Sequence, residues 1–202
     1  MKLIIIGAGG FAKQVIDVAQ LNKFEIIGII DDFSLEGLYD YPILGKISDL
    51  NELLSCQSEL KVFCGIGDTK VRERIFSLFP DRFVNCIHPT AVISTYSIIG
   101  TGNYIGPNVC IMPDVKIGHN NIIDPIVVLS HDVIIGNHNH LAAHCCLLGK
   151  VTIKDCNLIG SNSTVLPKIN VGSHNILGAG AVLTKSKEDN KILVGVPAKE
   201  RS

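Results

Sequence analysis

A histidine followed directly by an aspartate offers the clearest acid–base chemistry in this chain. His131 and Asp132 stand in the segment Leu129-Ser130-His131-Asp132. A neutral imidazole, with an ordinary pKa of about 6.5, can take a proton from an attacking amine or hydroxyl near neutral pH. A carboxylate beside it can orient the ring and raise its basicity. Because neighbouring residues on a straight strand point to opposite faces, this pairing requires a turn or a residue from a second chain.

A second candidate site is a glycine-rich turn near the start of the chain. Residues 7–12, Gly-Ala-Gly-Gly-Phe-Ala, fit the pattern G-x-G-x-x-A between a predicted strand and a predicted helix. The backbone amides of Gly9 and Gly10 would then face outward at a helix N-terminus and could hold a phosphate. A tight turn with no ligand is the alternative interpretation of the same pattern.

Polar residues follow two further predicted strands and point to the same crevice. Asp31 and Asp32 end the second strand, where a carboxylate can accept hydrogen bonds from ribose hydroxyls or a base. Gly67 and Asp68 follow the third strand. Four predicted strands make only half of a dinucleotide-binding fold, so a nucleotide with a short pendant group fits better than NAD.

The element that must carry His131 is a repeat with a period of six residues. From Ile87 to Leu183 every sixth residue is Ile, Leu or Val, seventeen in succession. This period fits neither a helix nor a lone strand, so it predicts short flat sides that stack on copies of themselves. Three sides close a coil of eighteen residues, and seventeen repeats make between five and six coils of a parallel β-helix.

Two other positions of the hexapeptide are also restricted. Two residues before each aliphatic, the side chains are mostly small or thin, as expected at the narrowing corner of a triangular core. The residue after the aliphatic is glycine seven times, and we expect it to lie at a corner where the backbone needs positive φ. These glycines are Gly100, Gly106, Gly118, Gly136, Gly160, Gly172 and Gly178.

Before the repeat, strands alternate with helices. Residues 2–6, 24–30, 61–64 and 82–87 are predicted strands, and residues 11–22, 48–55 and 69–79 are predicted helices. This alternation is typical of a small parallel α/β domain. The sequence therefore predicts a Rossmann-like domain over residues 1–86 and a β-helix domain with a C-terminal tail over residues 87–202.

Four histidines within fourteen residues raise the possibility of a zinc site, but their spacing disfavours it. They are His131, His138, His140 and His144. A zinc cage needs ligands that converge. The residues eighteen positions from His131 are Pro113 and Gly149, and none of these histidines has another one coil away. We therefore expect no metal.

Composition limits the remaining classes of function. A net charge of −1 argues against a nucleic-acid-binding surface, and no apolar run approaches the length of a membrane span. Seven cysteines without a C-x-x-C pair indicate a reduced, cytoplasmic setting.

Together these motifs resemble a known group. The ordered set comprises the glycine turn, the two aspartates, Gly-Ile-Gly-Asp at 65–68, His-Pro-Thr-Ala at 88–91, His131-Asp132 and Val-Gly-Val-Pro-Ala-Lys at 194–199. It resembles the bacterial sugar O/N-acetyltransferases of the hexapeptide-repeat acyltransferases, whose β-helix is left-handed. This group includes UDP-4-amino-sugar N-acetyltransferases of the bacillosamine type and sialic acid O-acetyltransferases. Many of its members carry Ser and His where Gly9 and Phe11 stand here.

The resemblance implies an assembly and an acyl donor. It implies a homotrimer in which acetyl-CoA lies between two neighbouring chains and His131 is the general base, with Asp132 beside it. The outward-facing aliphatics Ile98, Ile122 and Val128 are expected at the subunit contacts. His140 would donate to the thioester oxygen. The implied lining of the CoA groove is Asp124, His140, Gly149, Ser161 and Ala179.

The sequence thus predicts an acetyl-CoA-dependent N-acetyltransferase acting on a nucleotide-linked amino sugar, a UDP-4-amino-4,6-dideoxyhexose. O-acetylation of a sugar of the sialic acid type is an alternative. A non-enzymatic β-helix protein that binds a nucleotide is another.

Overall fold

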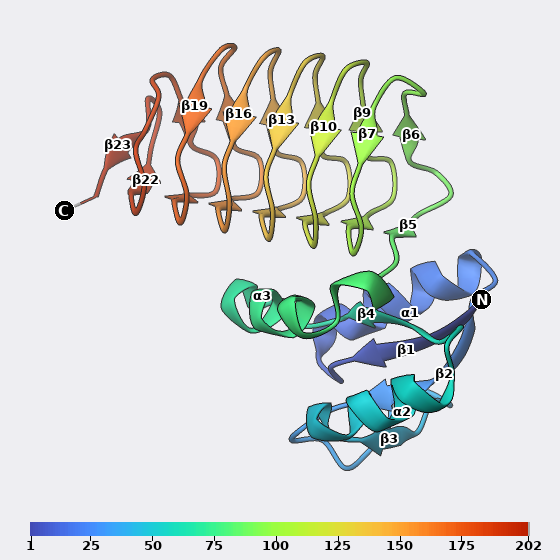
Figure 1. Cartoon of the computed structure of the whole chain (residues 1–202). Helices are drawn as coiled ribbons and strands as arrows, with labels where there is room; N and C mark the ends of the chain where they lie inside the picture. The colour runs from blue at the N-terminus through green and yellow to red at the C-terminus, as the bar shows by residue number, and fades with distance from the viewer. Residues whose placement is uncertain (202) are drawn as a thin grey trace. The chain divides into compact units, whose positions relative to one another are not determined.

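The computed structural model describes residues 1–201 and divides into two compact units, which are described separately. The first unit is Met1–Pro89, and the second begins at Thr90 (Figure 1). The boundary predicted after residue 86 lies close to this division.

The first unit is a small parallel sheet with helices. The four strands stand in the order β3-β2-β1-β4, and every pair is parallel. The elements are β1 (Lys2–Ile6), α1 (Gly10–Leu21), β2 (Glu25–Ile30), β3 (Ile43–Gly45), the 3-10 turn η1 (Ile47–Asp49), α2 (Leu50–Cys56), β4 (Lys61–Cys64), α3 (Thr69–Leu78), the 3-10 turn η2 (Pro80–Arg82) and β5 (Cys86–Ile87).

One strand of this unit was missed and another was predicted wrongly. The edge strand β3 is only three residues long and is half exposed, so it lacks the buried apolar run that reveals β1 and β4. The predicted strand over residues 82–87 is instead the turn η2 followed by the two-residue strand β5. Phe83 makes a single bridge to Val62, and Pro80 favours the helical turn before it.

Apolar faces hold the first unit together. Helix α1 buries Ala12, Val15, Ile16, Val18 and Ala19, residues spaced for one face of a helix. Strands β1 and β4 are buried over nearly their whole length. Each fully buried Ile or Val contributes about 1.5–3 kcal/mol relative to an exposed side chain.

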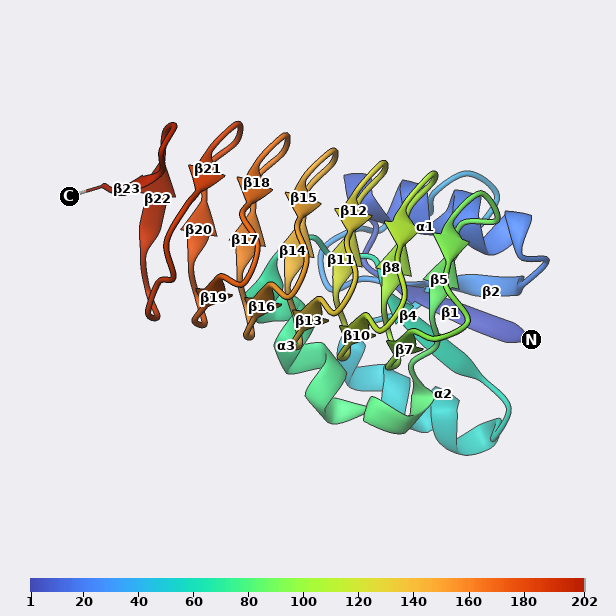
Figure 2. The same cartoon turned by 90° about the horizontal axis from the view of Figure 1, so that it is seen from above.

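The second unit is a β-helix with three faces (Figure 2). The first face contains β7 (Ile98–Ile99), β10 (Lys116–Ile117), β13 (Ile134–Ile135), β16 (Thr152–Ile153) and β19 (Asn170–Val171). The second contains β8 (Tyr104–Ile105), β11 (Ile122–Ile123), β14 (His140–Leu141), β17 (Leu158–Ile159), β20 (Ile176–Leu177), β22 (Ile192–Val194) and the antiparallel β23 (Lys199–Glu200). The third contains β6 (Val92–Ile93), β9 (Cys110–Ile111), β12 (Val128–Leu129), β15 (Cys146–Leu147), β18 (Thr164–Val165) and β21 (Val182–Leu183).

The register confirms the predicted coil of eighteen residues. Ile117 pairs with Ile135 and Ile123 with Leu141, each eighteen positions on. The last coil is shorter, because Ile176 pairs with Ile192, sixteen positions on. The aliphatic row is fully buried from Ile105 to Leu183. Ile93 and Ile99 are only half buried, since the first coil has a neighbouring coil on one side alone.

The corner positions are buried as predicted, and one corner carries a polar column. Asn103 Oδ1 accepts hydrogen bonds from the backbone amide of Asn121 at 2.9 Å and from its side-chain amide at 3.0 Å. The same pattern links Asn121 to Asn139 and Asn139 to Asn157. These buried amides satisfy one another, which keeps the polar column from destabilising the core.

The predicted reason for the corner glycines was wrong. Positive φ occurs two residues later in the hexapeptide, for example at Asp132 with φ 60° and Lys150 with φ 63°. The glycines after the aliphatics instead allow the coils to approach closely. A Cβ at Gly100 would lie 2.5 Å from the Gly118 carbonyl oxygen, and one at Gly160 would lie 2.5 Å from the Ala179 nitrogen.

The outer faces carry exposed aliphatics, though not all those expected. Ile98 is 63% exposed, and Ile134 and Ile176 are also exposed. Ile122 is only 1% exposed, which contradicts the expectation, and Val128 is half buried. Ile122 lies in the ladder between the large side chains of Tyr104 and His140.

Within residues 1–201, no helix combines the length and apolar character needed to cross a bilayer.

Candidate active site

A left-handed turn brings His131 and Asp132 together. Strand β12 ends at Leu129, and the corner that follows places Asp132 at φ 60°. His131 Nδ1 then lies 2.8 Å from Asp132 Oδ2. The chain thus meets the geometric requirement of a turn, which allows adjacent side chains to reach each other where a straight strand would not.

The pairing decides which imidazole nitrogen can take a proton. When Nδ1–H of His131 donates to the Asp132 carboxylate, Nε2 keeps its lone pair. The two side chains are 60% and 46% exposed, so solvent and a substrate can reach them. The hydrogen bond from His131 holds the pKa of Asp132 below its ordinary value, and the nearby charge of Lys150 acts in the same direction.

Gly149 makes room for the His131 ring. This buried glycine lies one coil along the same corner, and the amide of the next residue, Lys150, donates to the His131 carbonyl at 3.0 Å. A Cβ at Gly149 would stand 2.7 Å from both Cε1 and Nε2 of the imidazole. Any side chain at this position would therefore displace the ring.

A second histidine–carboxylate pair lies on another part of the β-helix. His140, in β14, places Nε2 at 2.9 Å from Oδ2 of Asp124, which follows β11 in the preceding coil. This contact occupies Nε2, so Nδ1 is the nitrogen that remains for a ligand. The sequence did not predict that Asp124 and His140 would contact each other.

The predicted CoA lining occupies two different corners of the prism. Asp124, Ser161 and Ala179 follow strands of the second face. Gly149, like His131, follows a strand of the third face. One face separates the two corners, so a single chain does not bring all of these residues to one place.

In the first unit, the glycine turn has open space beside it. Gly9 is the N-cap of α1, and a Cβ at Gly9, Gly10 or Gly67 would meet no atom within 4 Å. The two glycine loops abut: a Cβ at Gly7 would lie 2.5 Å from Ile66 Cγ1. They follow β1 and β4, where the strand order changes direction, and this is the usual ligand crevice of such sheets.

The aspartates of this unit already bind backbone amides. Asp31 accepts from Ala8 at 2.7 Å, from Phe33 at 2.8 Å and from Ser34 at 2.7 Å. Burial alone would raise the pKa of Asp31, but these hydrogen bonds lower it below its ordinary value. The carboxylate therefore ties the glycine turn to the end of β2.

Asp32 and Asp68 also have backbone partners. Asp32 Oδ1 accepts from the Ile47 amide at 2.9 Å, and Asp68 caps α3 by accepting from the Val71 amide at 2.9 Å. The sequence did not reveal these contacts, because each depends on where the chain turns after a strand.

Buried thiols are poor nucleophiles here. Burial raises the pKa of Cys64 to about 11 and that of Cys145 to about 12. Both therefore stay protonated near neutral pH.

Within residues 1–201, no three His, Cys, Asp or Glu side chains are grouped so as to hold a metal ion.

The chain matches two families and several known proteins. Residues 2–79 match the family described as the PglD N-terminal domain. Residues 114–149 match the family described as bacterial transferase hexapeptide (six repeats). PerB from Caulobacter crescentus, in a crystal structure with CoA and GDP-perosamine, is 30% identical with a TM-score of 0.92, and the match covers 100% of this chain and 98% of that one. The chain belongs to the bacterial sugar acetyltransferases of the hexapeptide-repeat family.

Two further matches differ in extent. The acetyltransferase domain of PglB from Neisseria gonorrhoeae FA1090, in complex with acetyl coenzyme A, is 25% identical with a TM-score of 0.89, over 99% of this chain and 98% of that one. The uncharacterized protein L142 of Acanthamoeba polyphaga mimivirus is 42% identical over 116 residues. That match covers 56% of this chain and 23% of the viral protein, so the chain matches about a quarter of its relative's length.

The predicted fold, an α/β unit followed by a left-handed β-helix, is confirmed.

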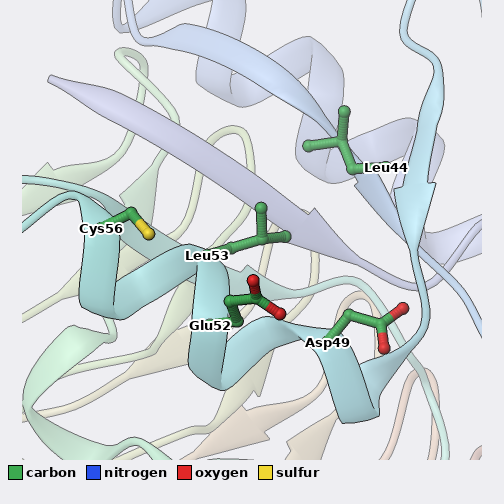
Figure 3. Close-up of a pocket in the computed structure, with 5 residues that line it drawn as sticks. All are labelled: Leu44, Asp49, Glu52, Leu53 and Cys56. Carbon is green, nitrogen blue, oxygen red and sulfur yellow. The ribbon is translucent and has the colours of Figure 1, made fainter.

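The first unit also contains a cavity that is separate from the candidate site residues. It has a volume of about 270 Å³ and is lined by Leu44, Asp49, Glu52, Leu53 and Cys56 (Figure 3). The Asp49 carboxylate points toward the chain that precedes α2, where it accepts from the Lys46 amide at 2.9 Å. None of the predicted site residues lines this cavity.

Proposed function

We propose that this protein is an acetyl-CoA-dependent N-acetyltransferase that acts on a nucleotide-linked amino sugar, a UDP-4-amino-4,6-dideoxyhexose. The observation that carries the proposal is the His131–Asp132 pair, at 2.8 Å, with the Nε2 edge of the ring beside Gly149. The family supplies the reaction class, and CoA complexes of two relatives support the acyl donor. PerB was crystallised with a GDP-linked sugar, so the nucleotide is the part of the proposal that most needs testing.

His131 would act as the general base. As the sugar amine attacks the thioester carbonyl, a nitrogen–carbon bond forms and His131 Nε2 accepts the amine proton. The carbon–sulfur bond then breaks, and the proton passes to the leaving thiolate, giving the amide and CoA. Asp132 stabilises the imidazolium formed in between. A positioned base of this kind accelerates a reaction by about 10² to 10⁴.

His140 would contribute to the same site through its remaining nitrogen. Because Nε2 is held by Asp124, Nδ1 is the atom that can approach the thioester oxygen. A neutral ring in this tautomer accepts at Nδ1, so a donor role at the thioester oxygen requires the protonated ring.

The first unit would bind the nucleotide. The open space at Gly9, Gly10 and Gly67 is suited to a diphosphate, since backbone amides at a helix N-terminus favour anions. Asp31 and Asp68 support this site by shaping its loops, whereas Asp32 has a second carboxylate oxygen that can meet a ribose hydroxyl. The free thiols of the chain are consistent with a reaction in the cytoplasm.

The active assembly would be a homotrimer. His131 and the predicted CoA-lining residues Asp124, Ser161 and Ala179 lie at different corners, and a neighbouring chain can bring the two corners together. Exposed Ile98 and Ile134 on the first face provide apolar contact area. Light scattering should therefore give three times the chain mass. A monomer with full activity would contradict the assembly.

The function is tested with a panel of acceptors. Purified protein is incubated with acetyl-CoA and UDP-, TDP- or GDP-linked amino sugars, and thiol release is followed. We expect release with a 4-amino sugar nucleotide and a product whose acetyl group survives mild base, as an amide does. A base-labile ester on a sialic acid would favour O-acetylation. Nucleotide binding without any thiol release would favour the non-enzymatic alternative.

A further inference from the structure

A buried arginine lies behind the second glycine loop of the first unit. Among the residues that the structure describes, Arg72 is the one charged residue that is fully buried, at 1% exposure. Burying a guanidinium is costly unless its N–H groups donate to acceptors. Arg72 Nη1 donates to the Gly67 carbonyl at 3.1 Å, so the side chain runs from the start of α3 back to the loop that precedes this helix. The arginine thus ties the helix to the loop.

The hydrogen bond from Arg72 fixes the direction of a backbone amide. In a trans peptide, the carbonyl of one residue and the N–H of the next lie in one plane and point in opposite directions. Because the Gly67 carbonyl points inward to Arg72, the Asp68 N–H points away from the guanidinium. Asp68 is the N-cap of α3, so its own N–H takes no part in the helix. The loop has room for a ligand beside it, since a Cβ at Gly67 would meet no atom within 4 Å.

Close packing joins this loop to the glycine turn after β1. A Cβ at Gly65 would lie 2.8 Å from Ala12 Cα, just as one at Gly7 would meet Ile66. The two loops follow β1 and β4, which are parallel neighbours in the sheet. An outward N–H at Asp68 therefore faces the same crevice as the N-terminus of α1, where we place the diphosphate of the acceptor.

The charge of Arg72 also acts on the end of β4. Burial raises the pKa of the Cys64 thiol to about 11, and the Ile66 amide and the Arg72 charge act in the opposite direction. Charges interact more strongly in such buried surroundings than in water. The guanidinium is therefore placed to offset the repulsion between the Asp68 carboxylate and a phosphate at the loop.

We infer that Arg72 is a positioning residue for the acceptor: its guanidinium holds the Gly67 carbonyl inward, so that the Asp68 N–H is aimed at the diphosphate. This inference rests on the proposed function, because it assumes a nucleoside diphosphate at the glycine turn. Arg72 is buried and acts through the loop, without touching the ligand. Its removal should therefore weaken binding of the phosphates and leave binding of the nucleoside unchanged.

Nucleotide binding by Arg72 variants tests this role. UDP and GDP are titrated by calorimetry, and uridine and guanosine by ligand-observed NMR, because PerB was crystallised with a GDP-linked sugar. Arg72→Gln should weaken the preferred diphosphate by about 10-fold, the value of one hydrogen bond to a charged group, and change nucleoside binding less than about twofold. Arg72→Lys keeps a charge and a donor, so it should recover part of the loss. Arg74→Gln, at an exposed position of the same helix, is the matched control and should bind the diphosphate as the unmodified protein does.

A second pair of variants tests the amide without changing the buried arginine. Asp68 has φ −65°, a value that proline adopts, so Asp68→Pro removes the N–H with little change of the backbone. Asp68→Ala removes the same carboxylate but keeps the N–H. We expect Asp68→Pro to bind the diphosphate about 10-fold more weakly than Asp68→Ala does. This comparison decides the question even if circular dichroism shows that the Arg72 variants do not fold.

Three results would overturn the inference. Arg72→Gln could bind the diphosphate as tightly as the unmodified protein, it could lose diphosphate and nucleoside equally, or the two Asp68 variants could bind the diphosphate equally. In each case, diphosphate binding and acetyl transfer by the unmodified protein would leave the proposed function standing. If the unmodified protein binds neither UDP nor GDP, the nucleotide part of the proposed function fails together with the inference.

Discussion

The glycines of the two units look alike in the sequence but have different physical roles. At Gly9 and Gly10 in the first unit, an added Cβ would meet only open space, so no neighbouring atom requires glycine there. In the β-helix, an added Cβ at Gly118 or Gly136 would meet the next coil, so the glycine serves packing. Gly149 is a third case, because its missing side chain leaves room for the His131 imidazole.

This contrast separates binding from chemistry. In the first unit, aspartates bind backbone amides and shape a crevice. In the β-helix, the regular coil positions a histidine, a carboxylate and a glycine that are contributed by neighbouring turns. Substitutions in the first unit should therefore change acceptor affinity, whereas substitutions at the His131 corner should change the rate of transfer.

Removal of the proposed base should have the largest effect. His131→Ala should lower kcat by about 10² to 10⁴, because the attacking amine loses its proton acceptor. Binding of both substrates, measured by calorimetry, should change little. A variant with near-normal kcat would show that proton transfer occurs elsewhere, and His140 would be tested next.

Filling the space beside the imidazole should have the next largest effect. Gly149→Ala would place a methyl group 2.7 Å from Nε2, so the ring must move. Displacement by about 1 Å can cost about 10² in rate. Gly178→Ala is the matched control, because the nearest atom to its Cβ would be Val194 Cγ1, at 3.0 Å, and the imidazole of His131 is not among its contacts. Equal kcat for the two variants would contradict the placement of His131.

A substitution in the first unit should affect only the acceptor. Asp32→Ala should weaken binding of the nucleotide sugar by about 10-fold, the cost of one lost hydrogen bond to a charged group. Acetyl-CoA binding should be unchanged. Asp32→Asn keeps an oxygen for the Ile47 amide and so separates the loss of charge from a disturbed loop. An equal loss of both ligands would refute the division between the units.

The carboxylate beside the base should have the smallest effect. Its pKa is lowered by the hydrogen bond from His131, so Asp132 stays ionised below its ordinary pKa of about 4 and does not titrate near neutral pH. Asp132→Asn should reduce kcat by about 10-fold or less, because the imidazolium formed during transfer loses a stabilising charge. Asp114→Asn, one coil earlier on the same corner, should leave kcat unchanged. A larger loss than that of His131→Ala would contradict these roles.

The sequence revealed periodic features well and contacts between coils poorly. The aliphatic row from Ile105 to Leu183 predicted the register, because one buried residue in six repeats without interruption. The role of Gly149 beside His131 depends on an eighteen-residue offset that only the coil makes visible. The contact of Asp124 with His140 was equally hidden, since it joins two coils through side chains. Ile122 was predicted as exposed because alternation alone does not show that large neighbours flank it.

The pH dependence of acetyl transfer, measured side by side in the unmodified protein and in His131→Ala, tests the central claim most directly. The account predicts that kcat/KM for the acceptor falls on the acid side of the profile, because a protonated imidazole cannot accept the amine proton. The residual activity of His131→Ala should lack this acid limb. The same limb at the same pH in both proteins would show that it arises from protonation of the acceptor amine, and it would contradict the assignment of His131 as the base.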